Sequence, residues 1–373
     1  MKPSKTNRPK QTSSRRNFLK AGVAAGIGIP AVIACGNAPQ TAPLEENEKG
    51  TLNDGSRRVL EMFDLQYPIF QAAPGGPALA IAVAGSGAMG AIDLWWRTPE
   101  DVRQVVSMLL AETQGKFYAN YVLHNFNPEA LDAALEAGCP NVQFSWGIPG
   151  EDVCERIKTQ GAKLGIQVSS KSGAAKALER NPDFLFCQGN EAGGHVQATS
   201  RLYDGLEEIV ELAGEIPVMA AGGISSGHHI RKAIHAGANG VVLGTRLMAT
   251  AESNAHDVYK RELVEAKEND TVYTNCFNRE WEAMHRVLRN PTFREWESLG
   301  CPTEGNRPGE SDVVATHPNF GPVLRYSGVP PLTGFDGSVE EMALYAGEGA
   351  KDIDDLPTAE ELIHRLWAEF ENR

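Results

Sequence analysis

Eight short apolar runs alternate with longer segments of helical spacing between residues 68 and 244, and this alternation restricts the folds open to the chain. The runs are too short for ordinary helices and are apolar along their length, which is typical of strands buried on both faces of a parallel sheet. Between them, as in residues 99–110 and 227–236, apolar residues recur every three or four positions, as on one face of a helix. The runs are Pro68–Ala72, Ala88–Leu94, Phe117–Leu123, Asn141–Trp146, Lys163–Ser169, Asp183–Gln188, Ile216–Ala221 and Gly240–Gly244.

Eight strand–helix units predict an α/β fold, a closed (β/α)8 TIM barrel, over residues 58–255. A doubly wound open sheet is the alternative, and the lack of a Gly-x-Gly-x-x-Gly sequence after the first run weakens its dinucleotide-binding form. Residues 256–373 are predicted to form a C-terminal helical extension packed on the barrel. Thr358 and Glu361 have the spacing of a capping box, which predicts the start of its last helix.

The first 35 residues have the features of an export signal. Arg15-Arg16 followed by Phe-Leu-Lys resembles a twin-arginine signal, and Val32-Ile-Ala-Cys35 resembles the lipobox of a bacterial lipoprotein. The chain is therefore expected to be exported by the twin-arginine route to the periplasm or cell surface, with a lipid anchor at Cys35 as its contact with the membrane. The alternative is a disordered, mildly basic tail. Residues 36–57 are predicted to be a linker, since they are rich in Pro, Ala, Asn and Glu.

Composition and charge exclude some classes of function. The formal net charge is -13, and no block rich in Lys and Arg follows the N-terminal segment, so no nucleic-acid partner is expected. Six cysteines occur without a Cys-x-x-Cys pair, so neither a metal site nor a redox motif is predicted.

Three predicted strands end in glycine-containing turns. The strand that ends at Gln188 continues as Gly-Asn-Glu-Ala-Gly-Gly-His195, and two later strands break at Gly222-Gly223 and Gly244-Thr245. In a barrel the strands end at one face, and phosphate is usually held after the seventh and eighth. The backbone N–H groups of the two later turns therefore predict a phosphate-bearing ligand. His195, a side chain that titrates near neutral pH, is the candidate catalytic residue.

The segments Gln188–His195, Ala220–Ile224 and Leu243–Arg246 resemble those of the nitronate monooxygenases, or 2-nitropropane dioxygenases, which are FMN-dependent barrels. The resemblance covers nearly all of residues 60–373. It implies FMN as the cofactor, a nitronate or nitroalkane as the small-molecule substrate, O2 as its co-substrate and His195 as the base. Met342–Gly347 looks like the family's late helix. With Gly222 added from the phosphate argument, the expected FMN contacts are Gln71, Asn120, Lys171, Gln188, Gly193, Gly222, Gly223, Val242, Leu243, Gly244 and Thr245.

Several alternatives remain open. The loops at Ala73–Gly76 and Gly85–Gly90 depart from the family pattern near the expected substrate position. His195 could remove a proton from a nitroalkane, act when protonated as an electrostatic anchor for a nitronate, or be an ordinary loop histidine. Trp95-Trp96 could be an aromatic wall over the site or simple packing. The other functional hypotheses are an FMN-dependent enoyl reductase, whose family shares the stretch Glu252–His256, and a non-catalytic flavin-binding barrel.

Overall fold

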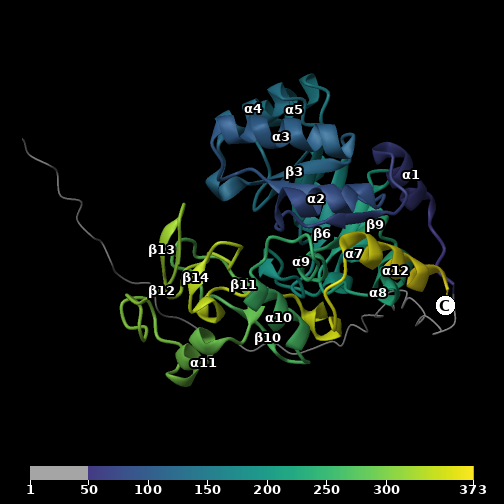
Figure 1. Ribbon diagram of the computed structural model, residues 1–373. Coiled ribbons are helices and arrows are strands. Elements are labelled where there is room, and N and C mark those ends of the chain that lie inside the picture. The colour runs from purple at the N-terminus through teal and green to yellow at the C-terminus, as the bar shows by residue number, and fades with distance from the viewer. Residues whose placement is uncertain (1–48, 373) are drawn as a thin grey trace, which may run out of the picture. The chain divides into compact units, whose positions relative to one another are not determined.

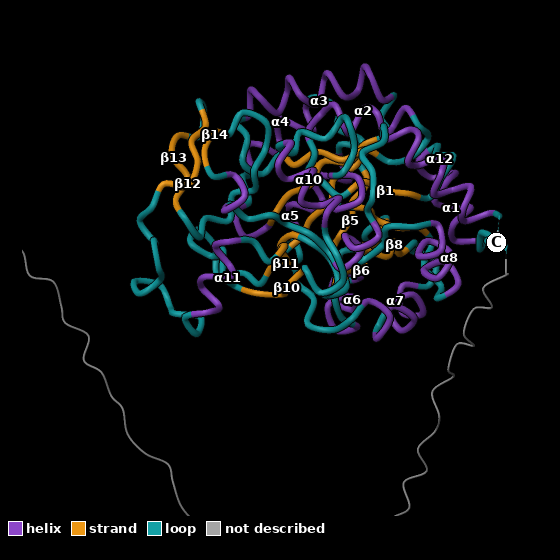
Figure 2. The backbone as a smooth tube through the Cα atoms, turned by 60° about the horizontal axis from the view of Figure 1, so that its bottom comes forward, coloured by secondary structure: helices purple, strands orange, loops and turns teal. Residues whose placement is uncertain are grey.

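The computed structural model describes residues 49–372, and its centre is a barrel of eight parallel strands (Figures 1 and 2). All eight strands lie within the predicted apolar runs. The order around the sheet is β1-β9-β8-β6-β5-β4-β3-β2, and a parallel bridge between Phe70 and Met89 joins the first strand to the last. The closed barrel is therefore confirmed and the open sheet is wrong. The strands are β1 (Ile69–Gln71), β2 (Gly90–Asp93), β3 (Phe117–Val122), β4 (Asn141–Ser145), β5 (Lys163–Val168), β6 (Phe184–Gln188), β8 (Val218–Ala221) and β9 (Gly240–Leu243).

Helices surround the strands, as Figure 2 shows, and many begin at side chains that cap the free backbone N–H groups of the first turn. Thr98 and Asn127 are examples, each followed by a proline at the first helical position. These helices are α2 (Gly76–Gly85), α3 (Pro99–Thr113), α4 (Pro128–Glu136), α5 (Glu151–Thr159), α6 (Lys171–Leu178), α7 (Leu206–Ala213) and α8 (Gly227–His235).

Helix α1 (Asp54–Phe63) precedes the first strand and packs on the side chains inside the barrel. Phe63 contacts Phe70 and Phe184 edge to face, with ring centroids 5.5 and 5.4 Å apart. Asn53 caps this helix by accepting a hydrogen bond from the Ser56 N–H at 2.8 Å. The predicted linker to residue 57 is therefore too long, because regular structure begins at Asp54.

Helix α12 (Ala359–Glu371) supplies the last outer helix of the barrel, although it is distant in sequence from β9. It packs on α8 and α2, and Leu362 and Leu366 belong to the same buried cluster as the barrel strands. The Arg231 guanidinium of α8 donates to the carbonyl of Phe370. The capping box of Thr358 and Glu361 is present as predicted. The predicted domain boundary at residue 255 thus places α12 outside the barrel, although α12 is one of the outer helices of the barrel.

The segment between β9 and α12 is a mixture of helices and strands, not the purely helical extension that was predicted. Its strands have mixed polarity and pair with partners distant in sequence, so they lack the continuous apolar signal of the barrel strands. β11 pairs with both β10 and β7, and β7 belongs to the loop that carries His195. The elements are α9 (Thr245–Met248), α10 (Asp257–Glu265), β10 (Thr271–Thr274), β11 (His285–Leu288), α11 (Pro291–Ser298), β12 (Val313–His317), β13 (Gly321–Leu324) and β14 (Asp336–Gly337), with β7 (Gly194–His195) from the barrel.

Residues 1–48, which include the predicted signal and Cys35, lie outside the described residues. Within residues 49–372, no helix combines the length and the apolar character that crossing a bilayer requires. The five cysteines of this part of the chain are free; four are buried, and Cys301 is exposed.

Candidate active site

Polar side chains form the last inward-facing layer of the barrel, at the carboxyl ends of its strands. Side chains alternate along a strand, and Tyr118 and Phe186 lie in the cluster that fills the barrel interior, so Asn120 and Gln188 face inward one step later. The same alternation points Asp93, Gln143 and Gln167 inward on β2, β4 and β5. Sequence reasoning found Asn120 and Gln188 but missed the other three, which counting by twos from the apolar interior positions could have identified.

Amide side chains in this layer hydrogen-bond to one another and to the loop that carries His195. Asn120 Nδ2 donates to Gln143 Oε1 at 2.6 Å, and Gln167 Nε2 donates to Gln197 Oε1 at 2.6 Å. Gln188 Oε1 accepts from the Gln197 N–H at 2.9 Å, and its Nε2 donates to the His195 carbonyl at 3.4 Å. The layer therefore fixes the loop while presenting amide groups at the barrel mouth.

The remaining predicted residues of β1 and β9 lie beside this layer. The Gln71 amide is buried and bonds to the Ala91 N–H and to the carbonyls of Pro74 and Ala91. Val242 faces the barrel interior, whereas the Leu243 side chain lies in the outer core, so Leu243 could meet a cofactor only through its backbone. Asp93 accepts a hydrogen bond from Trp96 Nε1 at 2.6 Å, and burial raises the pKa of its carboxyl.

The glycines of the two later turns have conformations and surroundings that suit a closely approaching anion. Gly222 and Gly223 have φ values of 132° and 65°, a region that favours glycine. A Cβ on Gly223 would stand 3.3 Å from Cβ of Glu191. Gly244 follows β9 beside Ala72. A phosphate group suits such turns because backbone N–H groups of glycine turns are common anion ligands.

A segment near the chain end, Ala346–Gly349, crosses the glycine turns, and we call it the strap. The Gly347 N–H donates to Thr245 Oγ1 at 2.9 Å. A Cβ on Gly193 would lie 2.5 Å from the Gly347 nitrogen, and one on Gly349 would lie 2.8 Å from the Gly223 carbonyl oxygen. The expectation of a helix at Met342–Gly347 is wrong, because Tyr345 forms an antiparallel bridge with Val287 and the strap leads into a 3-10 turn at Glu348–Asp352.

Buried and half-buried charges tie the strap to the His195 loop. Arg286 of β11 donates from Nε and Nη2 to the Asn190 carbonyl at 3.0 and 2.8 Å, and its Nη2 lies 3.3 Å from Glu348 Oε1. Arg201 bridges Glu348 and the buried Glu191, at 2.9 and 3.3 Å. Sequence reasoning missed Arg286 and Glu348, because the pairing of β11 with β7 brings Arg286 to the loop, and a hydrogen bond from the Glu348 N–H to the Glu191 carbonyl at 2.9 Å brings Glu348 there.

His195 lies in a box of aromatic rings. Its imidazole stacks on Trp281 with centroids 4.4 Å apart and planes at 26°, and the rings of Tyr345 and His285 follow at 5.3 and 5.8 Å. Trp146 presents its ring at 6.4 Å in a T-shaped arrangement. Burial among these rings, and the nearby His285, lower the pKa of His195 to about 3. The imidazole is therefore neutral at physiological pH, and within residues 49–372 neither of its ring nitrogens has a hydrogen-bond partner.

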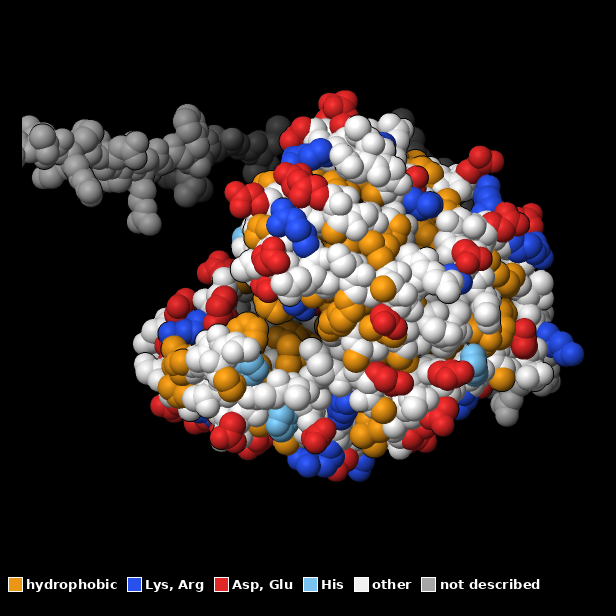
Figure 3. Space-filling model, turned by 45° about the horizontal axis from the view of Figure 1, so that its top comes forward, with side chains coloured by type: hydrophobic (Ala, Val, Ile, Leu, Met, Phe, Trp, Pro, Cys, Tyr) orange, Lys and Arg blue, Asp and Glu red, His pale blue; other side chains and the backbone are white. Residues whose placement is uncertain are grey.

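The remaining candidate residues, Lys171, Trp95 and Trp96, have contacts outside the aromatic box. Lys171, at the start of α6, is more than half exposed and lies 3.6 Å from Glu208 of α7. Trp96 is 45% exposed and packs against Phe320, while Trp95 packs on the outer core. Within residues 49–372, no three His, Cys, Asp or Glu side chains are grouped in a way that could hold a metal ion. On the face shown in Figure 3, a hollow with hydrophobic side chains at its walls opens between the main body of the molecule and the lobe at the lower left of the view.

Comparisons with known proteins agree with this architecture. A "Probable nitronate monooxygenase" of Staphylococcus saprophyticus is 29% identical over 268 residues, which are 59% of this chain and 76% of that protein. Among solved structures, FabK of Thermotoga maritima has a TM-score of 0.70 and 28% identity, covering 84% of this chain and 95% of that one. A nitroalkane oxidase of Streptomyces ansochromogenes shares the fold, with a TM-score of 0.67 at 24% identity over 83% and 97% of the two chains.

The family profile described as nitronate monooxygenase matches residues 56–369, which include the barrel, the His195 loop and the strap. A match of this extent covers every element that builds the site. The chain is an oxidoreductase and belongs to the nitronate monooxygenase family.

Proposed function

We propose that the protein binds FMN and oxidises nitronates and nitroalkanes with O2, with His195 as the neutral base that removes the α-proton of a nitroalkane. The observation that carries this proposal is the state of His195. Its ring nitrogens have no partner within residues 49–372, so a lone pair of the neutral imidazole is free to accept a proton. An anchor for an anion would need the protonated ring, which the aromatic box disfavours.

The chain offers matching groups for each part of the cofactor. Backbone N–H groups of the Gly222-Gly223 and Gly244-Thr245 turns would hold the phosphate, and the amides of Asn120 and Gln188 would hydrogen-bond to the ring edge. When bound, FMN supplies the electron acceptor for the substrate and the electron donor for O2. The aromatic box orients the imidazole of His195 by stacking, which holds the base in one position for the substrate.

The test uses the purified chain without its first 35 residues. We expect the visible spectrum of an oxidised flavin, and the cofactor released on denaturation should have the mass of FMN. Adding a nitronate under argon should bleach the flavin absorbance, and admitting air should restore it. A chain without bound flavin, or one whose flavin does not respond to nitronates, would contradict the proposal.

A second candidate is an FMN-dependent enoyl reductase, which the shared stretch Glu252–His256 favours. Such an enzyme takes its electrons from a reduced nicotinamide. The same argon experiment separates the two functions: bleaching by NADH or NADPH, without bleaching by nitronates, would favour the reductase. A flavin that responds to neither reagent would favour a non-catalytic flavin-binding barrel.

We further propose that the mature protein is exported and tethered through a lipid on Cys35. The support is the order of Arg15-Arg16, the apolar run and Val-Ile-Ala-Cys35. Twin-arginine export carries folded proteins, which suits a chain that acquires its cofactor in the cytoplasm.

A further inference from the structure

Trp281 covers the catalytic face of the barrel from the loop that joins β10 to β11. Its indole stacks on His195 at 4.4 Å and on His124 at 5.1 Å, with interplanar angles of 26° and 11°. It also meets Trp146 in a T-shaped contact at 4.5 Å. Trp281 thus contacts three barrel residues that follow or flank different strands, and it is the ring closest to His195 in the box.

Two other rings of the box, Tyr345 and His285, are held by hydrogen bonds, whereas Trp281 and Trp146 are held by ring contacts. The Tyr345 hydroxyl donates to the Gly328 carbonyl at 2.7 Å, and both nitrogens of His285 are bonded. Within residues 49–372, the indole N–H of Trp281 has no acceptor. When a side chain held only by stacking is truncated, space opens at its position. No buried polar group loses its hydrogen-bond partner.

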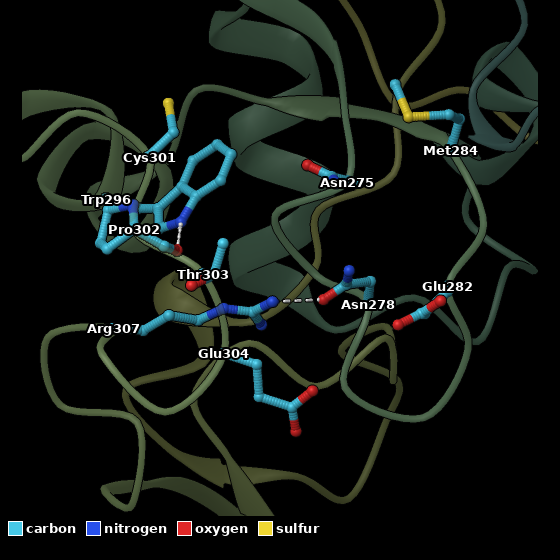
Figure 4. Close-up of a pocket in the computed structure, with 10 residues that line it drawn as sticks. All are labelled: Asn275, Asn278, Glu282, Met284, Trp296, Cys301, Pro302, Thr303, Glu304 and Arg307. Carbon is cyan, nitrogen blue, oxygen red and sulfur yellow. Dashed lines mark hydrogen bonds between the residues drawn. The ribbon is translucent and has the colours of Figure 1, made fainter. Parts of the chain in front are cut away.

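A cavity of about 510 Å³ lies beside the same segment (Figure 4). Glu282 and Met284 line this cavity, whereas Trp281 and His285 contact His195. Trp281 and His285 therefore face His195, whereas Glu282 and Met284 face the cavity. The backbone of this segment lies between the cavity and the surroundings of His195. The indole of Trp281 is the large side chain that the segment places on the His195 side.

We propose that Trp281 is the specificity-determining residue that limits how large a substrate can reach His195. This inference rests on the proposed function, in which the carbon next to the nitro group must come within reach of a His195 nitrogen. The alkyl chain of that substrate then extends into the aromatic box, where the indole faces His195. Short chains fit beside the indole, and longer chains collide with it.

The test compares the wild type with Trp281→Ala and Trp281→Leu across two series of ligands. The first series is the nitronates from nitroethane to nitrooctane, for which kcat/KM is measured. The second is the unreactive carboxylates from acetate to octanoate, whose binding is read from the change in the visible flavin spectrum. In the wild type, affinity should stop rising or fall as the chain lengthens. In the variants it should rise by up to about fourfold for each added methylene, the usual effect of burying one such group.

Trp367→Leu is the matched control. Trp367 lies on α12, donates from its indole to Glu371 at 2.9 Å and stacks on Phe370, away from the aromatic box. This variant should keep the wild-type dependence on chain length. A purely structural effect of Trp281 would lower affinity for all lengths alike, and that result, or an unchanged length profile in both Trp281 variants, would overturn the inference. Because the carboxylate series needs no turnover, it tests Trp281 even if nitronates fail to bleach the flavin, which would contradict the proposed function alone.

Discussion

His285 lies directly opposite His195 in the antiparallel pairing of β11 with β7, and the two imidazole centroids are 5.8 Å apart. His285 is fully buried; its Nε2 accepts from the Phe277 N–H at 3.1 Å, and its Nδ1 donates to the Ala283 carbonyl at 3.0 Å. Both nitrogens of His285 are thus occupied by the backbone, whereas those of His195 have no partner within residues 49–372. Two adjacent histidines therefore have different roles, one structural and one available for chemistry.

The lowered pKa of His195 predicts an unusual pH profile. A base must be neutral to accept a proton, and His195 stays neutral until the pH falls to about 3. We expect kcat/KM for a neutral nitroalkane to stay level between about pH 8 and about pH 5, whereas an ordinary histidine would lose about tenfold per pH unit below its pKa. Steady-state rates across this range give the profile. A decline centred near pH 6.5 would show that the site does not lower the pKa in solution.

Replacing His195 separates the two chemical roles considered for it. His195→Asn should leave flavin content unchanged, because other strands would hold the cofactor. Turnover of neutral nitroalkanes should fall by about two to four powers of ten, the usual contribution of a general base. Turnover of preformed nitronates should fall much less, because no proton remains to be removed. Equal losses on both substrates would mean that His195 positions or charges the site.

Gly223 offers a test of the phosphate site with a neutral control of nearly the same shape. Gly223→Asp should abolish FMN binding, because its carboxylate would face the phosphate. Gly223→Asn carries the same backbone cost at a φ of 65°, a conformation that both residues tolerate, but adds no charge. The flavin-to-protein ratio after purification measures the outcome. Equal flavin content in the two variants would place the phosphate elsewhere.

Arg286 should stabilise both the fold and the His195 loop. Arg286→Met removes two hydrogen bonds to the Asn190 carbonyl and the ion pair with Glu348, and the free energy of unfolding should fall by about 2–4 kcal/mol. The control is Arg289→Met, which breaks a more exposed pair with Glu297 at 2.8 Å and should cost about 1 kcal/mol or less. Thermal unfolding of the flavin-loaded variants compares the two. Similar losses of unfolding free energy in the two variants would mean that the link between the strap and the His195 loop stabilises the protein no more than an exposed ion pair does.

The N-terminal segment makes a prediction that is independent of the barrel. Replacing Arg15 and Arg16 by lysine should retain the precursor in the cytoplasm, and Cys35→Ser should give an exported but unacylated chain. Cell fractionation and metabolic labelling with a palmitate analogue measure the two effects. Normal fractionation and labelling in both variants would refute the proposed export and anchor.

The sequence predicted the barrel well because each strand has a local signal. Strands such as Phe184–Gln188 are continuous apolar runs that end in glycine or polar residues, and this pattern does not depend on distant partners. The same signal identified the loop of His195 and the turns at Gly222-Gly223 and Gly244-Thr245.

Features that depend on long-range pairing were missed. Residues of β11 have mixed polarity, so nothing local indicated that Arg286 would reach Asn190 or that Trp281 would stack on His195. The resemblance led to a helix at Met342–Gly347, whereas Tyr345 in this segment bridges to Val287, a partner distant in sequence. Lys171 was predicted from the family resemblance to lie near the flavin. In the structure its side chain forms an ion pair with Glu208.

The position of α12 has a consequence for the synthesis of the chain. Helix α2 contains no charged residue, and roughly 280 residues separate it from α12, which covers it in the finished barrel. A ribosome that adds about 5–20 residues per second needs about 15–60 seconds to cover that distance. Throughout this interval the surface of α2 that α12 will bury lacks its native partner, and the surface of α8 lacks it from the synthesis of α8 onward. Nascent chains are therefore expected to depend on chaperones until translation nears its end, and rapid overexpression should direct a larger share of them into aggregates.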